Sequence, residues 1–177
     1  MRDDKPTERP RGAARILGWA VNGGGVIAAG ATLILMVHII VDVAMRYLAN
    51  APLPGTIEVV SYWWMVLIIF PAVALTQRRR EHIDVSLMIE LMPDLHRKLS
   101  EIAARLVSIV LVLLLAWYGW FYALDQMERG EVAMGTVTVL IWPARFAIPL
   151  GMLLLALQLT EDLIASIRSL REEPPHE

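Results

Sequence analysis

Residues 57–80 read IEVVSYWWMVLIIFPAVALTQRRR, and this stretch decides the fold. Residues 57–76 contain one charged side chain, Glu58, and three consecutive arginines, Arg78 to Arg80, follow soon after. A helix rises about 1.5 Å per residue, so about 20 apolar residues cross the roughly 30 Å of hydrocarbon in a bilayer. The stretch therefore predicts a transmembrane helix over about 57–76, with its arginines at one membrane surface.

Three other segments are long and apolar enough to do the same. They cover about 16–47, 102–124 and 142–164. The composition agrees, because 56% of the 177 residues are hydrophobic, 19% are charged and the mean hydropathy is +0.54. The sequence therefore predicts an all-α integral membrane protein with four transmembrane helices, in a membrane domain of residues 15–168.

The basic residues are distributed unevenly between the two sides of this domain. Of the 16 Lys and Arg residues, 13 lie in or next to the tails and the connection between the second and third helices, whereas Arg46, Arg129 and Arg145 lie on the other side. Positive charge is retained on the cytoplasmic side of membrane proteins. We therefore expect a bacterial inner-membrane protein whose ends, residues 1–14 and 169–177, are disordered cytoplasmic tails.

Several functional classes find no support in the sequence. Cysteine is absent, which excludes disulfides and thiolate metal sites, and the net charge of -2 gives no basic footprint for nucleic acid. No phosphate-binding glycine loop, HExxH pair or nucleophile elbow is present. His38 is the one histidine within a predicted span, so no pair of histidines can hold haem at membrane depth. We expect no catalytic machinery, no cofactor and no metal.

The connection between the second and third spans is too polar to cross a bilayer, yet it is amphipathic. Pro93 interrupts it, so we expect one short helix before this proline and another that begins at it. An interfacial segment over about 82–98 has two interpretations, a surface helix that rests on lipid or a strut that grips a partner membrane protein. Its apolar stripe comprises Val85, Met88, Met92, Leu95 and Leu99.

Three ionisable residues share one face of the first helix. His38, Asp42 and Arg46 follow one another at intervals of four residues. Asp42 and Arg46 can therefore form an ion pair near the outer end of that helix. We favour a neutralised structural pair, and a proton or ion site is the alternative.

The loop after this helix ends in Pro54, Gly55 and Thr56, which predicts a turn followed by a residue suited to cap the second helix. Glu58 then falls in the first turn of that helix, where the helix dipole favours a carboxylate. Arg46 and Glu58 bracket the same short loop. We therefore predict a salt bridge between them that holds the first two helices together.

Small and aromatic residues within the spans have structural interpretations. Gly23–Gly25 and Gly30 permit close helix packing, and Pro149 with Gly151 predicts a kink in the fourth helix. Tyr62–Trp64 could line a ligand cage. Three consecutive residues point in different directions around a helix, so we favour lipid anchoring or helix packing.

Short motifs in a set order across about residues 16–165 provide a family resemblance. These are VAMRY at 43–47, PGTIE at 54–58, REHIDV at 80–85, Pro93, Trp142-Pro143 and IPLG at 148–151. Together with the four-span layout they resemble the small membrane subunit of tripartite ATP-independent periplasmic (TRAP) transporters, the DctQ type.

The resemblance implies a scaffold that pairs with a large permease subunit, which carries the sodium and substrate sites. A soluble periplasmic binding protein would deliver the substrate, typically an organic acid, and the outer loops would help to dock it. The candidate structural or partner-interface residues are Arg46, Pro54, Gly55, Glu58, Arg80, His82 and Pro149.

Two alternatives from other classes remain. One is a membrane-anchoring subunit of a redox or haem complex, and the other is a small transporter that works alone. The histidine count argues against the first and the scarcity of charged residues at mid-membrane depth against the second. The sequence does not identify the transported substrate.

Overall fold

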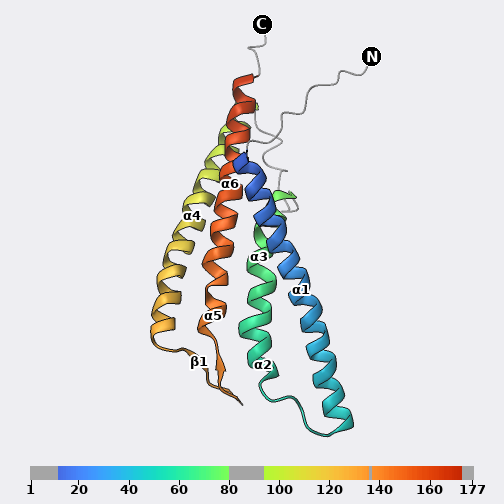
Figure 1. Cartoon of the computed structure of the whole chain (residues 1–177). Helices are drawn as coiled ribbons and strands as arrows, with labels where there is room; N and C mark the ends of the chain where they lie inside the picture. Colours follow the sequence, from blue (N-terminus) through green and yellow to red (C-terminus); the bar gives the residue numbers. More distant parts are fainter. Residues whose placement is uncertain (1–11, 80–93, 136, 173–177) are drawn as a thin grey trace, which may run out of the picture.

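A computed structural model describes residues 12–79, 94–135 and 137–172, and its path is shown in Figure 1. The elements are α1 (Gly12–Leu48), α2 (Thr56–Val59), the π-helix η1 (Val60–Trp64), α3 (Met65–Arg78), α4 (Asp94–Glu128), β1 (Val132–Ala133), β2 (Val139–Leu140), α5 (Trp142–Arg145) and α6 (Ala147–Glu172).

Four helical stretches are long and apolar enough to cross a membrane, so this part of the predicted fold is confirmed. The second of them is built from three elements, because α2, η1 and α3 follow one another without a break. The stretches are Ala14–Leu48, Thr56–Arg78, Leu99–Glu128 and Trp142–Ile167.

The four stretches form an open row rather than a closed bundle. In Figure 1 the order across the row is α4, α6, α3 and α1, and each helix makes its main contacts with the next one in this order. Helix α1 begins and α6 ends at one end of the row, which we call the terminal end. The α1–α2 loop and the two short strands lie at the other, which we call the hairpin end.

Small residues let neighbouring helices approach closely. A Cβ atom on Gly24 would overlap the Pro71 carbonyl oxygen, and one on Gly151 would overlap the Phe70 carbonyl oxygen. The predicted role in helix packing is therefore confirmed for Gly24, and also for Gly25, which lies against Leu75. Gly23 and Gly30 do not contact another helix of this subunit, because in the described part of the chain no atom lies within 4 Å of a Cβ placed on either residue.

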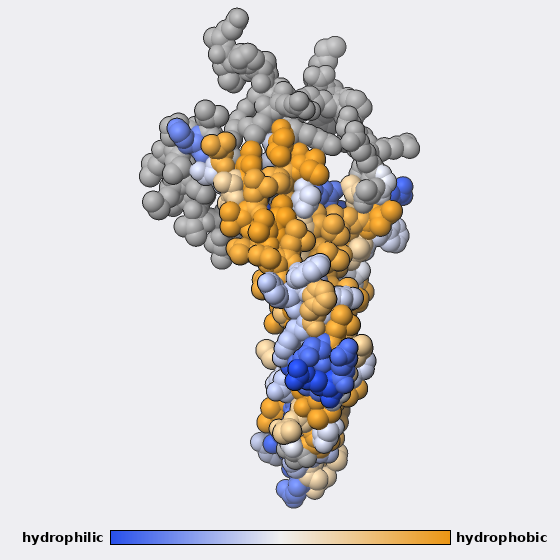
Figure 2. Space-filling view, turned by 90° about the vertical axis from the view of Figure 1, so that its left-hand side faces the viewer, coloured by the Kyte–Doolittle hydropathy of each residue, from blue (hydrophilic) through white to orange (hydrophobic). Residues whose placement is uncertain are grey.

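Most of the helical surface is left uncovered by this arrangement. The share of buried residues in the most apolar window of each stretch ranges from 6% to 28%. Figure 2 views the molecule from the side on which α4 lies in Figure 1, and it shows a broad apolar surface with a strongly polar patch nearer the hairpin end. Exposed residues of α4 include Leu106, Val107, Val110, Leu111, Leu113, Leu114 and Leu115.

The fourth stretch is interrupted between α5 and α6, at Phe146. Pro149 has no N–H group, so it cannot donate the helical hydrogen bond that the carbonyl of Arg145 would otherwise accept. The interruption therefore lies in the turn before Pro149, which is where a proline disrupts a helix, and the sequence predicts a kink from Pro149 with Gly151. The role of Gly151 is instead close contact with α3.

The connection between α4 and α5 contains a small hairpin that the sequence analysis did not predict. Val132 pairs with Leu140 and Ala133 with Val139 in an antiparallel register. The backbone N–H of Ile141 extends this pairing by donating to the carbonyl of Glu131 at 3.1 Å.

The interfacial helix predicted over about 82–98 falls largely on residues 82–93, outside the described part of the chain. Residues 94–98 are the beginning of α4, which continues without interruption into the third membrane stretch. The candidate residues Arg80 and His82 also lie outside the described residues.

Candidate functional site at Asp42

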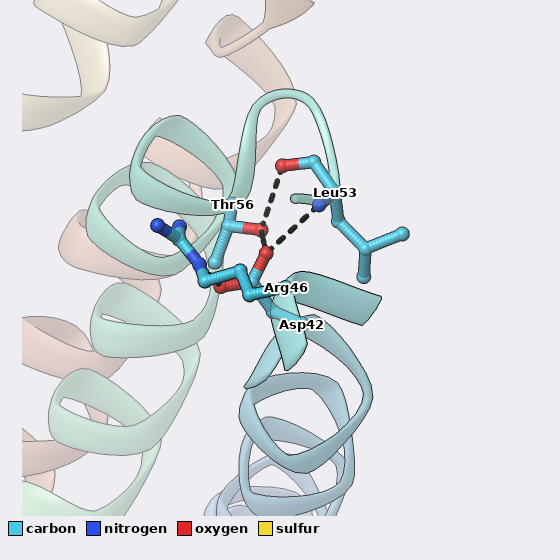
Figure 3. Close-up of polar contacts among 4 residues, drawn as sticks. All are labelled: Asp42, Arg46, Leu53 and Thr56. Carbon is cyan, nitrogen blue, oxygen red and sulfur yellow. Dashed lines mark hydrogen bonds and ion pairs between the residues drawn. The ribbon is translucent and has the colours of Figure 1, made fainter. Parts of the chain in front are cut away.

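The Asp42 carboxylate is a buried acceptor at the hairpin end that holds three different residues. Asp42 lies in the penultimate turn of α1 and is 5% exposed. Figure 3 shows three donors around it: Arg46 Nε at 2.8 Å, the backbone N–H of Leu53 at 2.9 Å and Thr56 Oγ1 at 3.1 Å. The arginine bonds Oδ2 and the other two bond Oδ1, so both carboxylate oxygens are used.

This arrangement fixes the path of the loop between α1 and α2. Leu53 lies in the loop and Thr56 begins α2, so one carboxylate on α1 holds both. Thr56 Oγ1 also lies 3.2 Å from the Leu53 carbonyl oxygen, and its single proton is shared between two acceptors. A buried carboxylate with several donors and an adjacent guanidinium is a stable structural anchor.

The predicted ion pair between Asp42 and Arg46 is confirmed, but two other predictions for this loop are wrong. Thr56 does not cap α2, because its hydroxyl turns back to Asp42 and Gly55 occupies the position before the helix. Arg46 bridges to Asp42 on its own helix and not to Glu58. Glu58 instead lies against Gly135 in the other loop, where a Cβ atom would overlap its carboxylate.

Pro54 and Gly55 form the predicted turn. Gly55 has φ of 82°, a left-handed conformation that favours glycine because other side chains are strained there. A Cβ atom on Gly55 would lie 3.4 Å from Val137 Cβ, so the α1–α2 loop packs on the hairpin. The two connections at this end therefore form one unit.

Two adjacent tryptophans tie the second membrane stretch to opposite neighbours. Trp64 Nε1 donates to His38 Nδ1 on α1 at 3.2 Å, and Trp63 Nε1 donates to the Leu140 carbonyl in β2 at 2.8 Å. Both residues belong to the π-helix η1, a form that often marks a specialised position in a helix. Both indole N–H groups are hydrogen-bonded within the chain. They therefore favour the interpretation as helix packing over that as a ligand cage.

A second ion pair at the hairpin end was missed by the sequence analysis. Arg145 Nε and Nη2 each donate to one carboxylate oxygen of Glu131, and the Arg145 guanidinium lies 4.9 Å from the ring centre of Tyr122 on α4. The Arg145 guanidinium lowers the pKa of the Glu131 carboxyl below its ordinary value, against the smaller opposing effect of burial. This pair joins the hairpin to α5 and α4.

A polar cluster at the terminal end was also missed. Gln77 of α3 donates to Asp162 Oδ2 of α6 at 3.1 Å, and the buried Gln158 donates to Asp162 Oδ1 at 3.3 Å. Ser166, one turn further along α6, accepts a hydrogen bond from Arg105 of α4. The spacing of these residues could have indicated the cluster. Gln158, Asp162 and Ser166 follow one another at intervals of four residues, as His38, Asp42 and Arg46 do.

The remaining candidate residue, Pro149, is buried and lies near Gly119 of α4, with 3.7 Å between its Cβ and a Cβ placed on the glycine. Among the described residues, no group of three or more His, Asp or Glu side chains is arranged to hold a metal ion. The site around Asp42 therefore consists of fixed protein-to-protein hydrogen bonds that position two connections.

Comparison with known proteins gives one positive finding. The family model described as "Tripartite ATP-independent periplasmic transporters, DctQ component" matches residues 35–169, which is most of the chain and includes all the contacts around Asp42. A search of curated proteins found no match. The family is one of transporter components and not of enzymes. The chain belongs to the DctQ family and is the small, multi-pass membrane subunit of a TRAP transporter.

Proposed function

We propose that this subunit is the fixed scaffold of a sodium-coupled uptake system for organic acids. It pairs with a large permease subunit, which carries the sodium and substrate sites, and a periplasmic binding protein delivers the substrate. Both subunits lie in the bacterial inner membrane, and the terminal end of the row faces the cytoplasm.

The open row of helices carries this proposal. A single layer leaves both faces of its central helices uncovered, and few residues of the four stretches are buried within the chain. A broad layer of this kind offers a large apolar area to a second membrane protein. A single layer formed by the described helices does not surround a solute pathway, which a self-sufficient transporter would need.

The anchors at the two ends support a rigid role. At the hairpin end, Asp42 holds the first loop and Arg145 holds the second. At the terminal end, Asp162 joins α3 to α6 through Gln77. Hydrogen bonds at both ends of the row oppose sliding of one helix past another, so the subunit moves as one body while its partner changes shape.

The hairpin end faces the periplasm in this proposal and takes part in docking the binding protein. Arg46 is suited to that contact, because its side chain is 51% exposed and Asp42 fixes it through Nε alone. The terminal nitrogens remain available for a carboxylate on the partner. Pro54, Gly55 and Glu58 shape the same surface, whereas the buried Pro149 supports the helix below it.

The test begins with co-expression of the tagged subunit and its genomic neighbours, followed by purification in mild detergent and mass spectrometry. The proposal expects a large multi-span permease at a one-to-one ratio. The pair is then reconstituted in liposomes, and uptake of candidate organic acids is measured with an inward sodium gradient and the binding protein outside. Arg46→Gln is expected to raise the concentration of binding protein needed for half-maximal uptake.

Arg129→Gln is the matched control, since Arg129 also lies at the hairpin end but pairs with an exposed Asp125. Recovery of the subunit alone, uptake by the subunit without a partner, or a haem absorption band in the purified protein would each overturn the proposal. Uptake that a potassium gradient drives as well as a sodium gradient does would overturn the proposal that sodium is the coupling ion. A membrane-impermeant label that reaches the hairpin end from the cytoplasm would overturn the orientation.

A further inference from the structure

An arginine at the terminal end is held in a notch between two helices. Arg78 Nη1 donates to the Gly18 carbonyl of α1 at 3.0 Å. A Cβ atom on Gly18 would lie 2.8 Å from Arg78 Nη1 and 3.0 Å from Nη2, closer than van der Waals contact permits. The absence of a side chain at Gly18 therefore lets the guanidinium sit directly against α1.

A second arginine lies on the same face of α1. Arg15 precedes Gly18 by three residues, so it lies one helical turn closer to the start of α1. Both arginines are exposed, and neither forms an ion pair within the described part of the chain. Asp162, the carboxylate that reaches α3 at this end, accepts from amides of glutamine and not from Arg78.

The surroundings indicate a lipid rather than a soluble ligand. Trp19 follows Arg15 by four residues on the same side of α1 and is 77% exposed, and Ile16 is 73% exposed. Tryptophan side chains of this kind lie at the headgroup level of a bilayer, with the ring towards the acyl chains. Two guanidinium groups that lack an ion-pair partner among the described residues, together with an interfacial tryptophan, match a phosphate group that is linked to an apolar tail.

We propose that Arg15 and Arg78 form a binding site for the phosphate of an anionic phospholipid, at the junction of α1 and α3. The Gly18 carbonyl positions Arg78 through Nη1 and leaves Nη2 and Nε to the phosphate, while Trp19 lies along the lipid. The site does not depend on pairing with the large subunit.

The test measures lipid binding to the full chain in detergent micelles, by native mass spectrometry and by the thermal unfolding midpoint. Dioleoyl phosphatidylglycerol is compared with dioleoyl phosphatidylcholine and with inorganic phosphate. Phosphatidylglycerol is expected to bind with higher occupancy and to raise the midpoint. Each of Arg15→Gln and Arg78→Gln is expected to weaken its binding about fivefold, the typical share of one arginine at an anionic membrane surface.

Gly18→Ala provides the sharpest variant, because both arginines are retained while the notch is filled. It is expected to displace the Arg78 guanidinium from α1 and to weaken phosphatidylglycerol binding, but by less than Arg78→Gln, because the flexible side chain shifts and keeps its charge. Gly23→Ala on the same helix, where a Cβ atom meets open space, and Arg129→Gln, where the arginine is paired, are the controls and should bind like the parent chain. Arg15→Gln alters an exposed side chain, so it remains informative if Gly18→Ala fails to fold.

Equal occupancy by the two phospholipids would overturn the proposal, as would unchanged binding in both arginine variants. Inorganic phosphate that raised the midpoint as much as phosphatidylglycerol would replace the lipid by a free anion and overturn it too. If Gly18→Ala bound like the parent chain, the proposed role of the Gly18 carbonyl in positioning Arg78 for the phosphate would be overturned.

Discussion

Trp64 donates a hydrogen bond from its indole nitrogen to Nδ1 of His38 at 3.2 Å, and this contact joins the π-helical turn of the second membrane stretch to α1. Because Nδ1 is the acceptor, the neutral imidazole carries its proton on Nε2. His38, which shares one face of α1 with Asp42 and Arg46, thus has a structural partner.

Trp64→Phe removes this hydrogen bond while most of the aromatic surface is retained. We expect it to lower the free energy of unfolding by about 1 kcal/mol, the usual net value of one such bond. Trp63→Phe should lower the free energy of unfolding by less, because the hydrogen bond from Trp63 to Leu140 is exposed. Water can donate to the Leu140 carbonyl in place of the indole. Tyr62→Phe is the control. Chemical unfolding in mixed micelles measures all three, and equal losses for the two tryptophans would contradict the interpretation.

The anchor at Asp42 gives a second prediction. Thr56→Val leaves the volume nearly unchanged but removes a buried donor, so it should cost about 1–2 kcal/mol and increase amide hydrogen exchange at residues 49–57. Asp42→Ala should cost more, about 3 kcal/mol, because it leaves the Leu53 N–H and the Arg46 guanidinium without their acceptor.

Thr32→Val is the matched control for the Thr56 variant. The Thr32 hydroxyl donates within its own helix, to Ala28 O at 2.9 Å, and no loop depends on it. Hydrogen exchange at residues 49–57 should therefore stay as in the parent chain. The anchor would be refuted by faster exchange in the Thr32 variant and unchanged exchange in the Thr56 variant.

The ion pair between Glu131 and Arg145 predicts how stability depends on pH. Since the pKa of Glu131 in the folded chain lies below its ordinary value of 4.5, the pair contributes its full stability above pH 4.5. That contribution is lost as the pH falls below 4.5 and through the lowered pKa of the folded state. Glu131→Gln should cost about 2 kcal/mol at pH 7 and progressively less in acid.

Thermal unfolding midpoints of the parent chain and Glu131→Gln between pH 7 and pH 3 measure this difference. Asp125→Asn is the control, because the Asp125–Arg129 pair is exposed on both sides and exposed pairs contribute about 0–1 kcal/mol. A difference between the parent chain and Glu131→Gln that stayed constant down to pH 3 would argue against a lowered pKa.

The parts of the fold that are local in sequence could be predicted. The four membrane stretches follow from long apolar runs, and the Asp42–Arg46 pair follows from a spacing of four residues on one helix. The Arg46–Glu58 bridge failed because proximity along a loop does not reveal which way its ends face. The Asp42 carboxylate holds Arg46 on its own helix through Nε, and the turn at Gly55 directs Glu58 towards the other loop.

Contacts between distant segments could not be predicted from one sequence. The hairpin has two paired residues on each side, too few for an alternating pattern to stand out. The Glu131–Arg145 and Gln77–Asp162 contacts depend on how helices are arranged in the row, which hydrophobic patterns leave open. Glycine shows the same limit, because Gly23 and Gly24 are neighbours in sequence but only Gly24 meets another helix.

That difference between neighbouring glycines gives the last prediction. Gly24→Ala and Gly151→Ala should each destabilise the chain by about 1–3 kcal/mol, because the new methyl group overlaps a backbone carbonyl that cannot rotate away. Gly23→Ala and Gly30→Ala should be neutral or stabilising by up to about 1 kcal/mol, because alanine favours a helix and nothing lies within 4 Å of the added carbon. Unfolding of the purified subunit measures the intrinsic effects. If Gly23→Ala and Gly30→Ala were harmless to the isolated chain but abolished co-purification of the large subunit, the exposed face of α1 would be part of the interface between the two subunits.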